Sequence, residues 1–167
     1  MFKLKAIPRG AALAAALCAA LLMSACAKKP GSDPGGLGVG VGGVAAPGST
    51  QDFVVNVGDR VFFDTDSSDL TAQSRGTLDR QAQWLVQYPR ISVTIEGHAD
   101  ERGTREYNIA LGARRATTVR DYLTARGVGG NRLRTISYGK ERPVAVCDDI
   151  SCWSQNRRAV TVITGGG

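Results

Sequence analysis

Apolar and polar positions alternate with two different periods in the second two thirds of the chain, and each period predicts a different kind of element. From Leu78 to Leu85, apolar residues recur at i, i+4 and i+7, which predicts an amphipathic helix over residues 70–88. Thr71 is a suitable N-cap for this helix, and Pro89 marks its end.

A second helix is predicted from Thr104, which can cap its first turn, to Arg126. Gly127 follows directly and suits the left-handed conformation that ends many helices. The apolar stripe of this helix includes Leu111, Val119 and Leu123.

Short segments rich in β-branched and aromatic residues predict the strands. They cover residues 53–57, 60–63, 91–96, 133–138 and 158–163, and Gly58-Asp59 can turn between the first two. Residues 139–156 are expected to form a loop. The order β-α-β-α-β-β predicts an α+β fold in which two helices pack on one face of a mixed β-sheet. We expect the folded domain to cover residues 51–164 and residues 165–167 to be a disordered tail.

The N-terminus has the pattern of an export signal. Three basic residues precede an apolar run over residues 11–23, which is followed by Ser24-Ala25-Cys26. That run is shorter than the roughly 20 apolar residues that a membrane-spanning helix needs. Residues 1–25 are therefore predicted to be a lipoprotein signal peptide, because small residues lead directly into a cysteine. An ordinary secretory signal cut near Ala25 is the alternative.

The predicted signal holds three of the 21 basic residues and none of the 15 acidic ones. Its removal leaves 18 basic residues against 15 acidic ones, so the formal net charge falls from +6 to +3. The whole-chain pI of about 9.5 therefore overstates the case for a nucleic-acid partner, and we expect none. A mild positive excess is compatible with an anionic cell-wall polymer without demonstrating one.

Residues 26–50 are predicted to be a flexible linker, because residues 27–50 contain eight glycines and three prolines. Within it, residues 38–43 match the dinucleotide-binding pattern G-x-G-x-x-G. That pattern needs a strand before it and a helix at its end. Glycine and proline flank it here, so nucleotide binding is not expected.

Four cysteines occur in the chain. Cys18 lies within the predicted signal and Cys26 directly after it, which leaves Cys147 and Cys152. An even pair in an exported chain predicts a disulfide. A zinc site is the alternative, although neither a histidine nor a second cysteine pair lies nearby.

Asp100 and Arg115 have the clearest candidate chemistry. Asp100 follows a predicted strand in a turn, and Arg115 lies fifteen residues later on the second helix. If that helix packs against the strand, a carboxylate and a guanidinium converge, and together they can bind a ligand that carries an ammonium and a carboxylate on one carbon. Diaminopimelate of bacterial cell-wall peptide is such a zwitterion. Spacing alone favours the alternative, a salt bridge between the two residues that only holds the fold.

Other polar and aromatic residues are given structural roles. His98 is the only histidine, and nothing near it completes a metal site or a catalytic triad, so neither is expected. Trp84 and Tyr88 are expected to pack in the core. Arg114 and Arg158 are expected to be surface charges.

Several motifs together carry a family resemblance. They are Gly97-His-Ala-Asp-Glu-Arg-Gly103, Tyr107-Asn108, Leu111-Gly-Ala-Arg-Arg-Ala116, Phe62-Phe63-Asp64 and Asn156-Arg157-Arg158-Ala-Val160. Residues 61–162, which span these motifs, resemble the OmpA-like peptidoglycan-binding domains, and within that family the peptidoglycan-associated lipoproteins. Ala99 and Gly112 stand where the wider family usually has threonine and serine.

The resemblance implies a ligand-binding role for five residues. Asp100 would pair with the ammonium of diaminopimelate, Arg115 would hold its carboxylate, and Asn108 would bond the peptide. Asp64 and Arg157 would make supporting contacts at the pocket rim.

A resemblance to the lipobox, in Leu22-Met-Ser-Ala-Cys26, implies that Cys26 carries the acyl chains of a lipoprotein. The family then implies an anchor in the outer membrane, with the domain facing the periplasm and binding peptidoglycan without covalent chemistry. It also implies partnership with TolB and other Tol proteins, and a role in cell division. No cofactor, no metal and no enzymatic activity are expected.

Two alternative functions remain open from the sequence. One is a wall-modifying periplasmic lipoprotein enzyme that uses His98, Asp100 and Glu101 as catalytic groups. The other is a stator-like or porin-linked wall anchor that shares this domain.

Overall fold

The computed structural model describes residues 45–166, so the predictions on the signal peptide, on Cys26 and on most of the linker fall outside the described residues. Four strands form one sheet with the order β1-β4-β2-β3. The strands are β1 (Arg60–Phe62), β2 (Ser92–His98), β3 (Leu133–Gly139) and β4 (Arg158–Gly165). β4 is antiparallel to both of its neighbours, and β2 is parallel to β3, which confirms the predicted mixed sheet.

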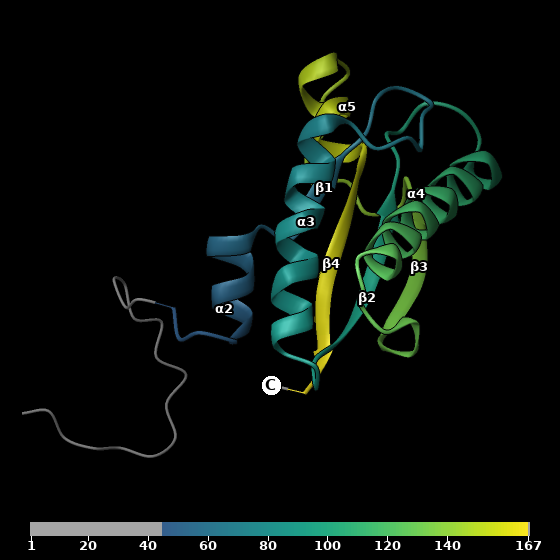
Figure 1. Ribbon diagram of the computed structural model, residues 1–167. Helices are drawn as coiled ribbons and strands as arrows, with labels where there is room; N and C mark the ends of the chain where they lie inside the picture. Colours follow the sequence, from purple (N-terminus) through teal and green to yellow (C-terminus); the bar gives the residue numbers. More distant parts are fainter. Residues whose placement is uncertain (1–44, 167) are drawn as a thin grey trace, which may run out of the picture. The chain divides into compact units, whose positions relative to one another are not determined.

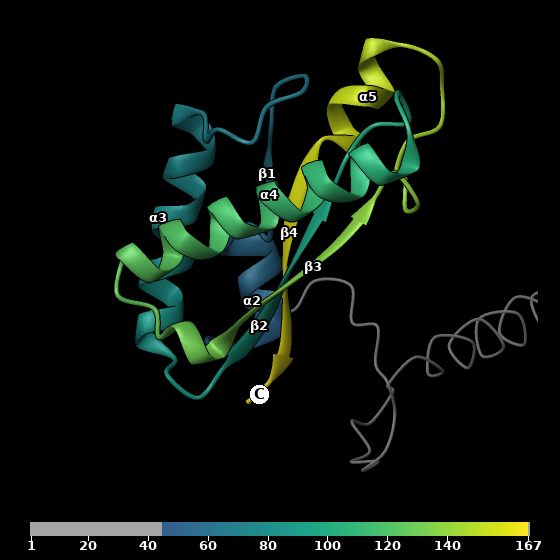
Figure 2. The same cartoon turned by 90° about the vertical axis from the view of Figure 1, so that its right-hand side faces the viewer.

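Two long helices, α3 (Ala72–Gln87) and α4 (Arg105–Ala125), cover one face of this sheet (Figures 1 and 2). Both predicted N-caps are confirmed, because the Thr71 and Thr104 hydroxyls accept hydrogen bonds from backbone N–H groups three residues later. The core lies between helices and sheet. Its fully buried members include Leu78, Leu85, Ile95 and Leu123, and Trp84 and Tyr88 pack against each other with ring centroids 4.7 Å apart. No helix between residues 45 and 166 is both long and apolar enough to cross a membrane.

Residues 53–57 are not a strand, and that prediction is wrong. A short helix, α2 (Thr50–Asp52), continues as a π-helical turn, η1 (Phe53–Val57), which packs beside α3 (Figure 1). Phe53 and Val57 are buried four residues apart, whereas the two valines between them are exposed. The overlooked signal is Ser49, whose hydroxyl accepts a bond from the N–H of Asp52, in the spacing of a helix N-terminus.

The segment expected to be a loop contains another helix, α5 (Ile150–Asn156), which the Asp149 side chain caps. The predicted disulfide between Cys147 and Cys152 is confirmed, with 5.6 Å between the two Cα atoms. A 3-10 turn, η2 (Gly130–Arg132), precedes β3. β4 runs further than expected, since Gly165 pairs with Ser92, so the expectation of disorder is wrong for Gly165. Gly167 lies outside the described residues.

Two glycines let α4 lie close to the sheet. A Cβ atom added at Gly97 of β2 would overlap the carbonyl oxygen of Gly112 in α4. One added at Gly112 would in turn meet the backbone of Gly97. This contact brings Arg115, three residues beyond Gly112, close to the end of β2 from which Asp100 follows.

We expect Gly97→Ala to lower the free energy of unfolding by at least about 2 kcal/mol, because overpacking backbone against backbone cannot be relieved by a side-chain rotation. Urea denaturation measures this. Gly76→Ala in α3 is the matched control, because a Cβ there meets nothing within 4 Å and should stabilise the helix by about 0.5–1 kcal/mol. Equal effects of the two substitutions would contradict the close-contact explanation.

Candidate functional site

Arg115 is fully buried, with 0% of its surface exposed, and is the largest side chain buried to this degree among the described residues. Its guanidinium donates hydrogen bonds to three backbone carbonyl oxygens, those of Ser67 at 2.8 Å, His98 at 2.8 Å and Asp64 at 3.1 Å. The ring of Phe63 lies 5.1 Å from the guanidinium carbon. Arg115 thus fixes the connection between β1 and α3, and the end of β2, to α4.

Burial changes the acid–base chemistry of Arg115 without removing its charge at neutral pH. Loss of solvation and, next, the positive charge of Arg157 lower the pKa of Arg115, Asp100 partly offsets them, and the net result is a pKa of about 10. A guanidinium has five N–H donors, and three are used in the bonds to carbonyls. Two donors therefore remain for a ligand.

Asp100 is paired with two other arginines. Arg102 donates to both of its carboxylate oxygens, at 3.1 Å and 2.7 Å, and Arg157 donates to one of them at 3.3 Å. Desolvation acts to raise the pKa of Asp100, but the hydrogen bonds from Arg102 and Arg157 outweigh it and hold that pKa below 3.8. The ion pairs of Asp100 within residues 45–166 do not include Arg115, so the alternative of a direct salt bridge is not what the structure shows.

Asp100 and Arg115 nevertheless line the same cavity, which has a volume of about 300 Å³. The lining consists of Thr65, Asp66, Asp100, Arg102, Gly103, Tyr107, Asn108, Leu111 and Arg115. Two carboxylates and two guanidiniums are among these groups. The cavity therefore offers both signs of charge to a ligand, and we call it the zwitterion cavity.

Asn108 projects into this region from the first turn of α4 and is buried. Its side-chain nitrogen donates to the carbonyl oxygens of Arg102 at 2.7 Å and Thr104 at 3.1 Å. These two bonds use both amide hydrogens and hold the loop after Asp100 against the helix. The side-chain oxygen of Asn108 is left to accept a bond from a ligand.

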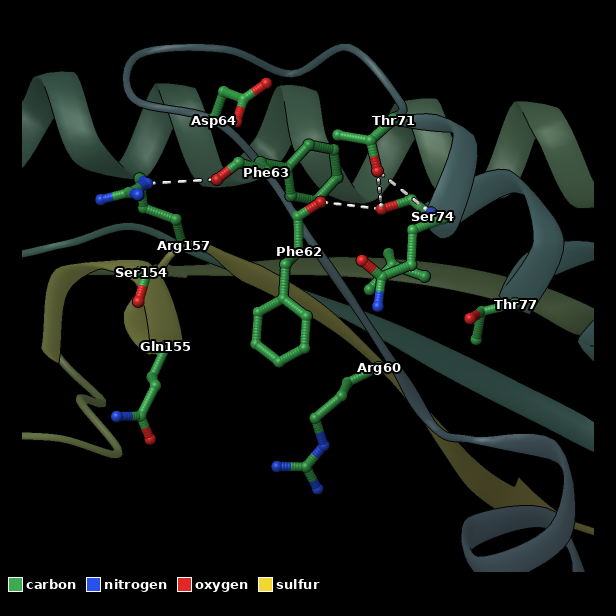
Figure 3. Close-up of a pocket in the computed structure, with 12 residues that line it drawn as sticks. Arg60, Phe62, Phe63, Asp64, Thr71, Ser74, Thr77, Ser154, Gln155 and Arg157 are labelled. Carbon is green, nitrogen blue, oxygen red and sulfur yellow. Dashed lines mark hydrogen bonds between the residues drawn. The ribbon is translucent and has the colours of Figure 1, made fainter. Parts of the chain in front are cut away.

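Asp64 and Arg157 line a neighbouring cavity of about 450 Å³ at β1 (Figure 3). Arg157 is buried, and its Nε donates to the carbonyl oxygen of Phe63 at 3.1 Å while Nη1 reaches Asp100. The side chain of Asp64 is exposed, and its backbone oxygen is the one that Arg115 bonds. The structure therefore places three of the five predicted residues in one cavity and two in the next, linked through Arg157.

Four further residues shape the zwitterion cavity and were not predicted from the sequence. Tyr107 donates a hydrogen bond to Asp66, which closes one side of the cavity. The guanidinium of Arg102 lies 4.2 Å from the ring centre of Trp153 on α5, which in turn donates to Glu101. Arg102 and Tyr107 lie within the recognised motifs, but Asp66 and Trp153 are brought in only by folding.

Two predictions on single residues have opposite outcomes. Arg114 is exposed, as expected, but Arg158 is only 4% exposed, so its assignment as a surface charge is wrong. Arg158 is held by the carbonyl oxygens of Asn156 at 3.4 Å and Arg142 at 3.1 Å. Arg158 is the first residue of β4 and directly follows Arg157. The sequence pattern therefore gives no sign that both arginines are buried.

His98 is buried, and neither ring nitrogen has a hydrogen-bond partner among residues 45–166. Desolvation and the nearby charges of Arg158 and Arg142 lower the pKa of His98 to about 4. Its backbone oxygen bonds Arg115, but its ring does not line the zwitterion cavity. Within the same residues, no group of three or more His, Cys, Asp or Glu side chains is placed to hold a metal ion.

Comparison with known proteins agrees with these motifs. Residues 62–157 match the family model described as the OmpA family. The peptidoglycan-associated lipoprotein of Rhizobium meliloti (strain 1021) is 68% identical over 154 residues, which cover 91% of this chain and 87% of that protein. The chain belongs to the OmpA family. The resemblance predicted from the sequence is thereby confirmed.

Solved structures of this family share the fold. The crystal structure of the peptidoglycan-associated lipoprotein from Burkholderia pseudomallei is 44% identical, covers 64% of this chain and 90% of that chain, and superposes with a TM-score of 0.62. The C-terminal domain of Helicobacter pylori MotB is 25% identical, covers 64% of this chain and 84% of that chain, and has a TM-score of 0.60. The same architecture therefore occurs in proteins with different names.

The buried His98 predicts a pH dependence of stability. Because the pKa of His98 is about 4 in the folded protein and 6.5 in the unfolded chain, the unfolded chain binds the additional proton between these values. Stability should be fully present above pH 6.5 and fall by up to about 3 kcal/mol as the pH drops to 4. Denaturant unfolding at several pH values measures this. His98→Phe, which keeps a ring but cannot titrate, should flatten the dependence, and an unchanged slope would contradict the assignment.

Proposed function

We propose that this protein binds the stem peptide of peptidoglycan without covalent chemistry, and that the zwitterion cavity holds the end of diaminopimelate. The observation that carries this proposal is the placement of a buried cation, Arg115, and a carboxylate, Asp100, on the walls of one cavity. A ligand with an ammonium and a carboxylate on the same carbon complements both. The name of the Rhizobium meliloti relative, a peptidoglycan-associated lipoprotein, supports the proposal.

Two contacts in the proposed complex use groups with spare hydrogen-bonding capacity, and a third exchanges one cation for another. The ligand carboxylate takes the two free N–H donors of Arg115, and the side-chain oxygen of Asn108 accepts a peptide N–H. The ligand ammonium takes the place of Arg102 on Asp100. That exchange is open to Arg102 because 42% of its side chain is exposed, so its guanidinium can turn to solvent.

The cellular role in this proposal is a tether. Acyl chains on Cys26 anchor the protein in the outer membrane, and residues 51–164 hold the cell wall on the periplasmic side. Partnership with TolB and other Tol proteins, and a role in cell division, belong to the same proposal. They are supported by the naming of the relatives as peptidoglycan-associated lipoproteins.

The arrangement gives little support to an enzyme that modifies the wall. His98, the proposed catalytic group of that alternative, has its ring away from the zwitterion cavity and a pKa of about 4. Incubation of purified sacculi with the protein separates the two functions. Retention of the protein on sacculi without released muropeptides is the outcome expected of a tether.

Substitution of the two site charges tests the binding proposal. We expect Asp100→Ala to weaken binding of an L-Ala-D-Glu-diaminopimelate tripeptide by ~2–5 kcal/mol, because it leaves a charged partner unpaired. We expect a loss in the same range for Arg115→Lys, because an ammonium lacks the paired donors that a carboxylate needs. Calorimetry measures both.

Arg120→Ala and Asp121→Ala are the matched controls. These two residues carry one positive and one negative charge, lie on α4 as Arg115 does, and pair with each other outside the cavity. They should leave affinity unchanged. The site assignment is wrong if the cavity variants, folded normally by circular dichroism, bind the tripeptide as tightly as the unsubstituted protein.

Amidation of the ligand tests the contact to Arg115 without any change to the protein. A tripeptide whose diaminopimelate side-chain carboxylate is amidated should bind at least about tenfold more weakly, because a bidentate charge-assisted contact is lost. With Arg115→Lys the difference between the two tripeptides should shrink. Equal affinity of the unsubstituted protein for both tripeptides would place the carboxylate elsewhere.

A further inference from the structure

The cavity of about 450 Å³ at β1 has no role in the binding scheme beyond its two members Asp64 and Arg157. Its volume lies within the range of roughly 300–1,000 Å³ that is usual for small-molecule sites. β1 is an edge strand, and the cavity lies along that edge, between residues of α3 and of α5 (Figure 3). We call it the edge cavity.

Phe62 gives the edge cavity an apolar surface. Phe62 is 43% exposed, and its ring points into the space between Arg60 and Gln155 (Figure 3). Arg60 is already neutralised, because Asp59 accepts two hydrogen bonds from it at 2.8 Å each. An uncharged ligand with one apolar face therefore fits beside Phe62 better than an anion does.

Neutral polar side chains line the same cavity and keep unused hydrogen-bonding groups. Gln73, in the first turn of α3, is one of them. Gln155 uses one amide N–H to bond the carbonyl oxygen of Ser151, and Thr77 only accepts a bond, from Arg80. Amides and hydroxyls around an exposed aromatic ring are the groups that hydrogen-bond and stack on a sugar, which carries hydroxyls at its rim and C–H groups on its face.

A peptide strand added to the edge of β1 is less favoured. Such a strand needs the outward backbone groups of β1. The carbonyl oxygen of Phe62 already accepts a hydrogen bond from the Ser74 hydroxyl at 2.8 Å, and Ser74 is buried (Figure 3). This side-chain bond covers the acceptor that an added strand would use.

The two cavities have no lining residue in common, but hydrogen bonds join the residues of one to those of the other. Arg157 lines the edge cavity and bonds Asp100 in the zwitterion cavity. Asp64 is among the residues that line the edge cavity, and its backbone oxygen bonds Arg115. A peptide held at Asp100 and Arg115 can therefore continue past Arg157 toward Phe62.

We propose that the edge cavity binds an N-acetylated amino sugar of the glycan strand that carries the bound stem peptide. The sugar packs its C–H face on Phe62 and hydrogen-bonds Gln73 and Gln155. This inference rests on the proposed function, because it places the glycan relative to a peptide in the zwitterion cavity. It predicts that the protein distinguishes wall fragments by their sugar as well as by their peptide.

Calorimetry with the full-length chain in detergent micelles tests the proposal with two probes. One is the N-lactoyl tripeptide L-Ala-D-Glu-diaminopimelate, which keeps the amide linkage without the sugar. The other is the same tripeptide on an N-acetylglucosamine–N-acetylmuramic acid disaccharide. We expect the disaccharide-peptide to bind about tenfold more tightly, the gain that one or two net hydrogen bonds supply.

Substitution then locates the gain. Phe62→Ala should remove it and leave the affinity for the lactoyl tripeptide unchanged, and Gln155→Ala should reduce it without an effect on folding, because Gln155 is exposed. Ile136→Ala is the matched control, since Ile136 is 41% exposed on β3, the opposite edge strand, and should keep the full gain.

Each outcome bears on the proposal. Equal affinity of the unsubstituted protein for the two probes overturns the sugar site alone and leaves the peptide site standing. A loss of affinity for both probes in Phe62→Ala and in Gln155→Ala also overturns it, because the cavity would then serve the peptide. Failure of the unsubstituted protein to bind either probe overturns the proposed function together with this inference.

Discussion

The buried guanidinium of Arg115 is the constraint on which the rest of the site depends. Removing such a charge from water without partners costs several kcal/mol, so the fold has to supply acceptors for it. It does so with three backbone carbonyl oxygens, from Asp64, Ser67 and His98, rather than with a carboxylate. Two of these oxygens lie in the connection between β1 and α3 and the third at the end of β2, so one cation on α4 holds both segments. The positive wall of the zwitterion cavity is thus part of the fold itself.

The neighbouring acid is balanced in a different way. Asp100 shares its charge with Arg157, which is buried, and with Arg102, whose side chain is 42% exposed. Binding of an ammonium therefore exchanges one cation for another on Asp100, and the loss of the Arg102 contact offsets part of the gain. Such an exchange favours specificity over affinity. Only a ligand whose carboxylate also accepts hydrogen bonds from Arg115 gains enough free energy to offset the displacement of Arg102.

Local sequence signals predicted the parts of the fold that local physics controls. The 3.6-residue period and the hydroxyl caps set the positions of α3 and α4, and the cysteine pair in an exported chain predicted the disulfide. The strand prediction for Phe53 to Val57 is wrong because its valines favour a strand, whereas burial of Phe53 against Trp84 on α3 favours a helix. The buried Arg158 was also missed, because its acceptors are carbonyl oxygens that no side-chain pattern encodes.

The site was predictable only as far as its motif extends along the chain. Asp100, Asn108 and Arg115 lie within twenty residues, but Thr65 and Asp66, which line the same cavity, come from the connection between β1 and α3. Residues in and after α5 support the site from outside the cavity lining. Trp153 stacks on Arg102, and Arg157, which directly follows α5, bonds Asp100. The disulfide joins α5 to the preceding loop, and Asn156 bonds the backbone of the same loop at Val144 and Ala145. The cysteine pair therefore stiffens the element that carries Trp153 and leads into Arg157, and with it the contacts that these two residues make to Arg102 and Asp100 of the zwitterion cavity.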